Sequence, residues 1–107
     1  MNNNNSIIEL AKNTLNTNAL LESKEKLILF NLIYTLKPKK ILEIGSFKGG
    51  SAEIIYNAIE ANKIGKLILI DINPKIPKEK WEKIKNRTNL LIGDSFIGNL
   101  HSRIFPG

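Results

Sequence analysis

The spacing of apolar residues along the chain changes at Pro38. On its N-terminal side apolar positions recur every three or four residues, the period of an amphipathic helix. This predicts a short helix over about 7–15 and a second helix from about Ser23 to Leu36. Ser23 is the predicted N-cap of the second helix, and Pro38 ends that helix because proline lacks a backbone N–H. The stripe expected to be buried on it is Leu29, Leu32, Ile33 and Leu36.

Beyond Pro38 short apolar runs alternate with helical patterns. The predicted order is strand 40–44, helix 49–62, strand 66–70, helix 77–86 and strand 89–92. Uninterrupted apolar strands are typical of parallel sheets that helices cover on both faces, joined by right-handed crossovers. The predicted fold class is therefore α/β. We expect a partial Rossmann-like fold of three parallel strands in spatial order 3-2-1, with flanking helices and an N-terminal helical segment.

The length allows a single domain. A chain of 107 residues buries about two-thirds of its unfolded surface, which is enough for a modest core. The asparagine run in residues 1–5 has nothing apolar to bury and is predicted to be a disordered tail, which leaves 6–107 as the folded domain. The absence of cysteine excludes disulfides and thiolate metal sites, and no apolar run reaches membrane-spanning length. We therefore expect a cytoplasmic protein, and no metal ligand is assigned.

The formal charge of +6 raises nucleic-acid binding as an alternative, since lysines that neutralise phosphates release counterions. The lysines are scattered, however, and their densest group falls on one predicted helix and the residues beside it. A solvated helix face explains such a group without a partner, so neither nucleic acid nor a membrane is the expected partner. The group consists of Lys75, Lys78, Lys80, Lys83, Lys85 and Arg87.

A glycine-rich turn follows the first predicted strand. Gly45 ends the strand and Gly49-Gly50 open the next helix, so the backbone can approach a ligand where open α/β sheets leave a crevice. A phosphate-binding P-loop needs Lys before its Ser or Thr, whereas Gly50 precedes Ser51. A dinucleotide fingerprint needs a small residue where Phe47 stands, which disfavours NAD and FAD. A nucleoside ligand without a pyrophosphate remains.

The ends of the next two strands carry further candidates. Asp71 ends the second strand, where a carboxylate can accept hydrogen bonds from both hydroxyls of a ribose, and Ile72 can lie against an adenine ring. Asp94 and Ser95 follow the third strand at the same edge of the sheet, where their polar groups can contact the adenine edge. Each has a plainer alternative: Asp71 as a polar strand end, and Asp94 and Ser95 as caps of a following helix.

These three strand ends resemble the successive cofactor motifs of class I S-adenosylmethionine-dependent methyltransferases. The motifs are Ile41 to Ala52, Leu69 to Asp71 and Ile92 to Ser95. The likeness covers roughly residues 20–98. It is nearest to small O-methyltransferases of the catechol O-methyltransferase type and to the cephalosporin-hydroxylase-like branch, which favour an aromatic residue at the place of Phe47 and serine at that of Ser51.

The resemblance implies S-adenosylmethionine as the cofactor and gives each candidate residue a role. Glu43 would hold the methionine ammonium group, Ser51 the methionine carboxylate, and Asp71 the ribose. These roles agree with the charges, since a helix N-terminus favours an anion and a strand-end carboxylate favours a cation; for Glu43 too the plainer alternative is a polar strand end. The remaining implied contacts are Gly45, Ser46, Phe47 and Gly49 around the methionine moiety, Ile72 at the adenine face, and Asp94 with Ser95 at the adenine edge.

No catalytic residue is assigned. In the family a fourth strand pairs beside the first, and this strand and later segments carry the substrate-binding and catalytic residues, so the resemblance implies that the S-adenosylmethionine-binding domain over 6–107 is incomplete. His101 is not expected to be a catalytic base, because an isolated histidine near a chain end is usually exposed or packed. Trp81 and Ile84 share a helix face and are expected in the core.

Three functions follow as alternatives. The leading one is the cofactor-binding half of an S-adenosylmethionine-dependent methyltransferase that acts on an oxygen of a small molecule or sugar. The second is a truncated or split form that binds only cofactor or a partner chain. The third is a nucleotide-binding oxidoreductase half, which Phe47 disfavours. Because no fourth strand lies beside 40–44, that strand leaves an open edge, and we expect a homo-oligomer, a complementing chain or aggregation.

Overall fold

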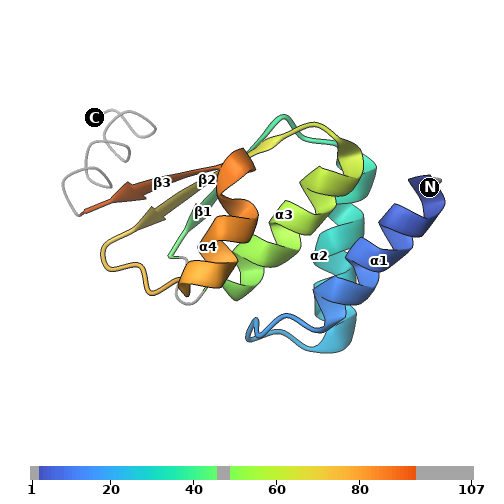
Figure 1. Cartoon of the computed structure of the whole chain (residues 1–107), viewed down its shortest axis with the longest axis horizontal. Coiled ribbons are helices and arrows are strands. Elements are labelled where there is room, and N and C mark those ends of the chain that lie inside the picture. The colour runs from blue at the N-terminus through green and yellow to red at the C-terminus, as the bar shows by residue number, and fades with distance from the viewer. Residues whose placement is uncertain (1–2, 46–48, 94–107) are drawn as a thin grey trace, which may run out of the picture.

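The computed structural model describes residues 3–45 and 49–93, with side chains from Ile7 onward. Figure 1 shows a sheet at one end, paired helices at the other, and a central helix between them. From Pro38 onward each predicted element is present, with its ends shifted by no more than two residues. The elements are α1 (Asn3–Leu15), α2 (Ser23–Leu36), β1 (Lys40–Ile44), α3 (Gly50–Asn62), β2 (Lys66–Asp71), α4 (Lys78–Ile84), the 3-10 turn η1 (Lys85–Arg87) and β3 (Thr88–Ile92).

The three strands form one parallel sheet in the order β1-β2-β3. This is the predicted order 3-2-1, and the predicted α/β fold class is confirmed. Leu42 pairs with Ile68, and Ile68 pairs with Asn89, so the three strands lie in close register. Because parallel strands point the same way, all three carboxyl ends lie at one edge of the sheet.

The core lies on one face of this sheet. Leu67 and Leu69 are fully buried there, and Ile41 and Leu90 of the neighbouring strands pack beside them. The same cluster contains the inner side of α3 and Ile84 of α4. Helix α3 also packs against α1 and α2. The cluster includes no described residue of the opposite face. On that face Leu42 is 45% exposed and Ile44 is 62% exposed, whereas Ile70 of the central strand is 1% exposed. The described helices pack on the core face (Figure 1), so the prediction of helices on both faces is met on only one face of the described sheet.

The first helix starts earlier than predicted. Helix α1 begins at Asn3, so residues 3–5, which we predicted to belong to a disordered tail, are helical; residues 1 and 2 lie outside the described part. Asparagine is a weak helix former but does not break a helix, and an added turn fixes few new residues once the helix exists. The start of α2 also differs. Ser23 is its first residue and Glu22 is the N-cap, whose N–H donates to Glu25 Oε1 over 3.0 Å.

The buried stripe of α2 also differs from the prediction. Phe30 and Ile33 are buried, whereas Leu32 is 53% exposed and Leu36 is 67% exposed. Nearly every position between Leu27 and Leu36 is apolar, so the spacing alone fits more than one face of the helix. The packing of α1 and α3 against α2 determines which of its residues are buried.

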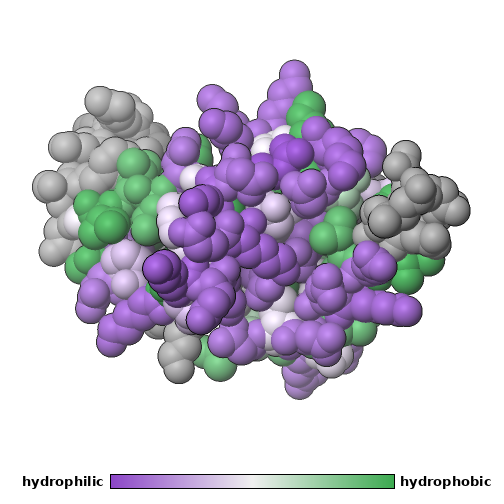
Figure 2. All heavy atoms as spheres, viewed as in Figure 1, coloured by the Kyte–Doolittle hydropathy of each residue, from purple (hydrophilic) through white to green (hydrophobic). Residues whose placement is uncertain are grey.

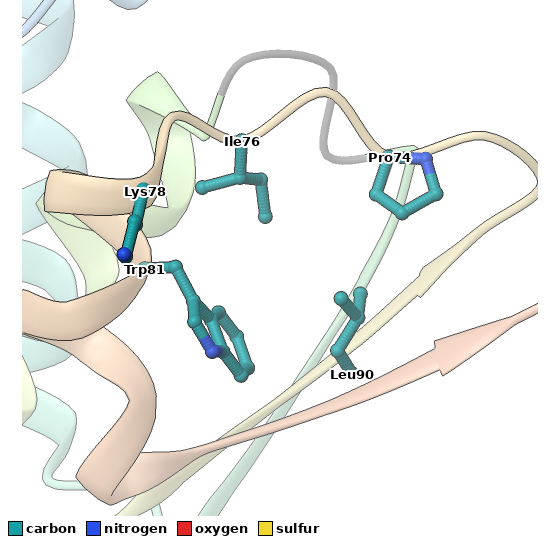
Figure 3. A pocket seen from close by; sticks show the side chains of 5 residues that line it. All are labelled: Pro74, Ile76, Lys78, Trp81 and Leu90. Carbon is teal, nitrogen blue, oxygen red and sulfur yellow. The ribbon is translucent and has the colours of Figure 1, made fainter.

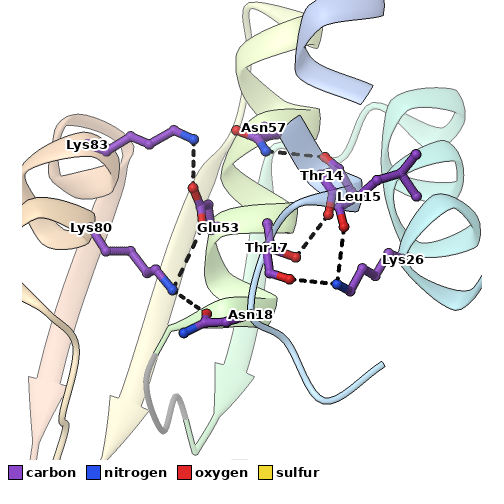
Figure 4. A network of polar contacts seen from close by, with 9 residues as sticks. All are labelled: Thr14, Leu15, Thr17, Asn18, Lys26, Glu53, Asn57, Lys80 and Lys83. Atoms are coloured by element: carbon purple, nitrogen blue, oxygen red, sulfur yellow. Dashed lines mark hydrogen bonds and ion pairs between the residues drawn. The ribbon is translucent and has the colours of Figure 1, made fainter. Parts of the chain in front are cut away.

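A buried lysine fixes the connection between α1 and α2. Lys26 Nζ donates to Thr17 O over 2.6 Å and to Leu15 O over 3.3 Å, which caps the end of α1. Asn57 Nδ2 of α3 donates to Thr14 Oγ1 over 3.2 Å, and both side chains are fully buried. Figure 4 shows Lys26 of α2 at the end of α1, and the Asn57–Thr14 hydrogen bond that joins α3 to α1.

Candidate functional site

The ends of the three strands meet at one edge. Ile44 pairs with Ile70, and Asp71 pairs with Ile92. The ladder continues into the turns, since Gly45 N–H donates to Ile70 O over 2.7 Å and Gly93 N–H donates to Asp71 O over 3.1 Å. The structure therefore brings Glu43, Gly45 and Asp71 to the same edge, the place where open α/β sheets bind ligands.

Two glycines at this edge have positive φ and no described side chain or backbone packed on them. Gly45 has φ +81° and Gly93 has φ +117°, a backbone conformation that L side chains rarely adopt. Among the described residues, no heavy atom beyond the two chain neighbours lies within 4 Å of the place where a Cβ would stand at either residue. The described residues therefore leave the main chain uncovered at both strand ends.

The glycine pair that precedes and opens α3 has a different environment. A Cβ on Gly49 would stand 3.1 Å from Lys80 Cδ and 3.2 Å from Ile76 Cγ2, and one on Gly50 would stand 2.5 Å from Ala19 Cα. At these two positions the close approach expected from the sequence is made by other segments of the protein. Ser51 follows in the first turn of α3, where the backbone N–H groups have no acceptor within the helix.

The surroundings of Glu43 disfavour its charged form. It pairs with Leu69 of β2, which in turn pairs with Leu90 of β3, so its side chain projects from the face that holds the core. Its Oε1 atom is buried and has no hydrogen-bond partner in the described part of the chain. Burial raises the pKa of Glu43 from 4.5 to about 7. A buried carboxylate without a partner is unfavourable as an anion, so the position favours a cation beside it.

Asp71 and two isoleucines form the middle of the edge. Asp71 Oδ1 accepts the N–H of Asn73 over 3.1 Å, a local turn that orients the carboxylate. Ile72 is 59% exposed beside it. Ile92, which sequence reasoning did not select, pairs with Asp71 and is equally exposed. Only the register of the strands places Ile92 beside Asp71. An apolar residue at a strand end does not by itself indicate a ligand site in the sequence.

Several predicted residues lie outside the described residues. These are Ser46, Phe47, Asp94, Ser95 and His101. Their roles stay predictions.

A hollow of about 250 Å³ lies between the β2–α4 connection, α4 and β3 (Figure 3). Trp81 lines it and is partly buried, while Ile84 of the same helix is fully buried, in line with the expected core positions. Ligand pockets commonly measure about 300 to 1,000 Å³, so this hollow is small by that measure. None of the predicted site residues within the described part of the chain is among the residues that line it. The lining residues are Pro74, Ile76, Lys78, Trp81 and Leu90.

The basic group around α4 is largely paired with acids. Lys80 and Lys83 both reach Glu53, at 3.8 and 2.7 Å, and Arg87 Nε donates to Glu60 Oε2 over 2.8 Å. The Arg87 hydrogen bond holds the pKa of Glu60 below its usual value. Figure 2 shows a largely hydrophilic surface over α4 and α3. Four of the six basic side chains in this group therefore have an acidic partner nearby, two of them sharing Glu53.

The described residues contain neither a metal-binding cluster nor a membrane-spanning helix. Over 3–45 and 49–93, no group of three or more His, Cys, Asp or Glu side chains is placed to hold a metal ion. The same residues contain no helix that is both long enough and apolar enough to cross a membrane.

The fold defines a class of protein. A parallel β1-β2-β3 sheet, with glycines between β1 and α3 and an acid at the end of β2, is part of a Rossmann-like α/β fold. Comparison with solved structures narrows the class, since the chain has part of the fold of S-adenosylmethionine-dependent methyltransferases.

Two solved structures illustrate the likeness. A "putative O-methyltransferase" from Klebsiella pneumoniae matches with a TM-score of 0.61 and 19% identity, over 87% of this chain and 45% of that protein. An SAH-bound methyltransferase from Podospora anserina matches with a TM-score of 0.60 and 22% identity, over 84% of this chain and 42% of that protein. The chain thus spans less than half the length of either. No family model and no curated protein matches its sequence.

Proposed function

We propose that the chain is the cofactor-binding part of an S-adenosylmethionine-dependent methyltransferase. The observation that carries the proposal is Glu43 Oε1, a buried carboxylate oxygen without a partner in the described residues, two positions before the open Gly45 turn. The amino-acid end of the cofactor carries an ammonium group, which is the kind of partner this oxygen lacks. The residues present therefore fit the cofactor.

The other groups of the edge match the rest of the molecule. The N-terminus of α3 with Ser51 would bind the methionine carboxylate, and Asp71 would accept hydrogen bonds from the ribose hydroxyls. Ile72 would lie on the adenine face. In this proposal Gly45, Ser46, Phe47 and Gly49 surround the methionine moiety, and Asp94 with Ser95 contacts the adenine edge.

When bound, S-adenosylmethionine supplies an electrophilic methyl group on a sulfonium. The described residues would hold the two ends of that molecule and so fix where its methyl group points. Methyl transfer depends largely on holding the acceptor in line with the sulfur–carbon bond. We propose an oxygen of a small molecule or sugar as the acceptor; the neighbour named as an O-methyltransferase supports oxygen. No described residue is assigned as its base.

A second candidate is a chain that binds cofactor or a second copy of itself without catalysis. The observation in its favour is that β1 pairs only with β2 in the described sheet, while Leu42 and Ile44 beside that edge are exposed. Such an edge can add a strand from another chain.

Titration calorimetry distinguishes the proposals. We expect the chain to bind S-adenosylhomocysteine in preference to NAD and ATP, and Asp71→Ala to weaken that binding about tenfold or more, as loss of a charge-assisted hydrogen bond does. Glu9→Gln, at an exposed acid on α1, is the matched control and should bind like the parent. Preference for NAD would favour an oxidoreductase half, and no binding to any of the three would contradict the methyltransferase proposal.

The pH dependence of the same affinity tests Glu43 itself. Glu43 must be ionised to pair with an ammonium group, and burial raises its pKa to about 7. Affinity should therefore rise between about pH 6 and pH 8. Glu43→Gln should bind S-adenosylhomocysteine more weakly than the parent chain. Its affinity should also change little between about pH 6 and pH 8. An equal rise in the variant would exclude Glu43 as the cation partner.

A further inference from the structure

One side-chain contact spans the glycine pair at the start of α3. Lys80 Nζ of α4 donates to Asn18 Oδ1 of the α1–α2 connection over 2.5 Å. These residues are 62 positions apart in sequence. Figure 4 shows the lysine reaching across from α4 to the connection, with Glu53 of α3 beside it.

The glycine pair lies between the two segments that this contact joins. On one side Lys80 Cδ is 3.1 Å from where a Gly49 Cβ would stand. On the other side Ala19, the neighbour of Asn18, is 2.5 Å from where a Gly50 Cβ would stand. The methylene groups of Lys80 thus pack on Gly49. Its amine hydrogen-bonds Asn18, whose neighbour Ala19 packs on Gly50.

Glu53 gives the same lysine a third contact. Its Oε1 lies 3.8 Å from Lys80 Nζ, and the Lys80 side chain is only 12% exposed. The N–H of Glu53 donates to Gly49 O over 3.0 Å, the first hydrogen bond of α3. Lys80 therefore joins α4, α3 and the α1–α2 connection around the residue that begins α3.

The geometry points to Lys80 as a positioning residue for the ligand site, which it serves by clamping the Gly49-Gly50 turn between α4 and Asn18. The ligand part of this inference rests on the proposed function, in which that turn and Ser51 hold the amino-acid end of the cofactor. A turn already held in its binding shape loses less conformational freedom when a ligand arrives, so the clamp raises affinity without touching the ligand.

The chain contains a matched control for Lys80. Lys83 lies three residues further along α4 and also pairs with Glu53, through Oε2 at 2.7 Å. Removing either lysine leaves Glu53 with the other, and both substitutions remove one positive charge. No described contact joins Lys83 to Asn18 or to the glycine pair. A difference in exchange rate or affinity between Lys80→Met and Lys83→Met therefore reports on the contacts that Lys80 alone makes with Asn18 and Gly49.

The first test needs no ligand. Amide hydrogen exchange of the Glu53 N–H reports opening of the turn, and that of Ile59 reports opening of the middle of α3. We expect Lys80→Met and Asn18→Ala to speed exchange at Glu53 about tenfold relative to Ile59, and Lys83→Met to leave this ratio unchanged. Asn18→Asp keeps an acceptor for the amine and should keep the slow exchange. Equal ratios in Lys80→Met and Lys83→Met would overturn the clamp.

The second test measures affinity for S-adenosylhomocysteine by calorimetry. Lys80→Met and Asn18→Ala should each weaken binding about three- to tenfold, and the double variant should be little worse than either, because both remove one contact. Lys83→Met should bind like the parent. Unchanged affinity in Lys80→Met would overturn the ligand part of the inference. Failure of the parent chain to bind would instead overturn the proposed function, while the exchange experiment still decides the clamp.

Discussion

Glu43 of β1 stands opposite Leu69 of β2, on the face of the sheet that carries the core. Leu69 is fully buried, and on its other side it pairs with Leu90. An acid in line with two leucines gains no stability from that position, because desolvation disfavours its charged form. The proposed pairing of Glu43 with a cation would offset this cost when the ligand is bound.

The stability of the ligand-free chain should therefore fall as Glu43 ionises. The pKa of Glu43 in the folded chain is about 7 against an ordinary value of 4.5, so the folded state holds the proton more tightly. The free energy of unfolding then decreases from about pH 4.5 to pH 7. After discounting for partial solvent access, we expect this group to contribute a decrease of about 1 to 2 kcal/mol.

Urea unfolding of the parent and of Glu43→Gln at pH 4.5 and pH 7.5 measures this contribution. Glu43→Gln has no carboxyl group to ionise at this position. The free energy of unfolding of the variant, relative to that of the parent, should therefore be higher at pH 7.5 than at pH 4.5. Glu9→Gln serves as the control for loss of an exposed acid. A pH-independent difference between the parent and Glu43→Gln would contradict the assigned burial effect.

The strands were predictable because their signal is local. Lys40–Ile44 and Lys66–Asp71 are short apolar runs bounded by Pro or Gly on one side and an acid or a glycine turn on the other. Continuous apolar runs of this kind indicate parallel strands, and short crossovers leave few topologies to choose from. The common edge of Glu43 and Asp71 follows from that topology alone.

Features that depend on tertiary packing were not predictable. The spacing on α2 fits several faces, and only the placement of α1 and α3 buries Phe30 while leaving Leu32 exposed. The neighbours of Gly50 and Gly49 are Ala19 and Lys80, which are distant in sequence. The burial of Glu43 was missed for a similar reason, since an acid at a strand end looks solvated until the neighbouring strands are placed.

Gly50→Ala should be strongly destabilising. Its Cβ would stand 2.5 Å from Ala19 Cα and 2.6 Å from Ala19 N, so the backbone of the α1–α2 connection would have to move. Overpacking of this kind costs about 1 to 3 kcal/mol, and we expect a loss near the upper end because the obstacle is main chain. The midpoint of urea unfolding measures it.

Gly45→Ala is the matched comparison. Its Cβ would meet no atom of the described residues within 4 Å, so we expect mainly the strain of φ +81°, about 1 to 2 kcal/mol. Asn tolerates this region better than Ala, and Gly45→Asn should recover part of the loss. A Gly50→Ala variant no less stable than Gly45→Ala would contradict the tight packing of Ala19 on α3.

Lys26 should stabilise the chain through its buried amine. It donates to Thr17 O and Leu15 O at the end of α1. Lys26→Met keeps the length of the stem but leaves both carbonyls without this donor, at a cost of about 1 to 3 kcal/mol. Lys24→Met, at an exposed position on the same helix, should change stability by less than about 0.5 kcal/mol. Similar losses in both variants would show that the amine contributes nothing specific.

Association of the chain with itself is the expected consequence of the exposed side of β1. Leu42 and Ile44 are 45% and 62% exposed on the face without a described helix, and β1 pairs with no strand other than β2 in the described sheet. An apolar edge strand is a template for pairing with another chain. Sedimentation should therefore give a mass above the 12.0 kDa of one chain.

Two single substitutions identify the surface responsible. Ile44→Lys places a charge on the β1 face and should shift the chain toward monomer, because a lysine there opposes strand addition. Ile28→Lys places the same charge on the exposed side of α2, where Ile28 is 63% exposed, and should leave the mass distribution unchanged. Dissociation by Ile28→Lys and not by Ile44→Lys would assign association to α2 instead, and a monodisperse monomer of the parent chain would contradict self-association altogether.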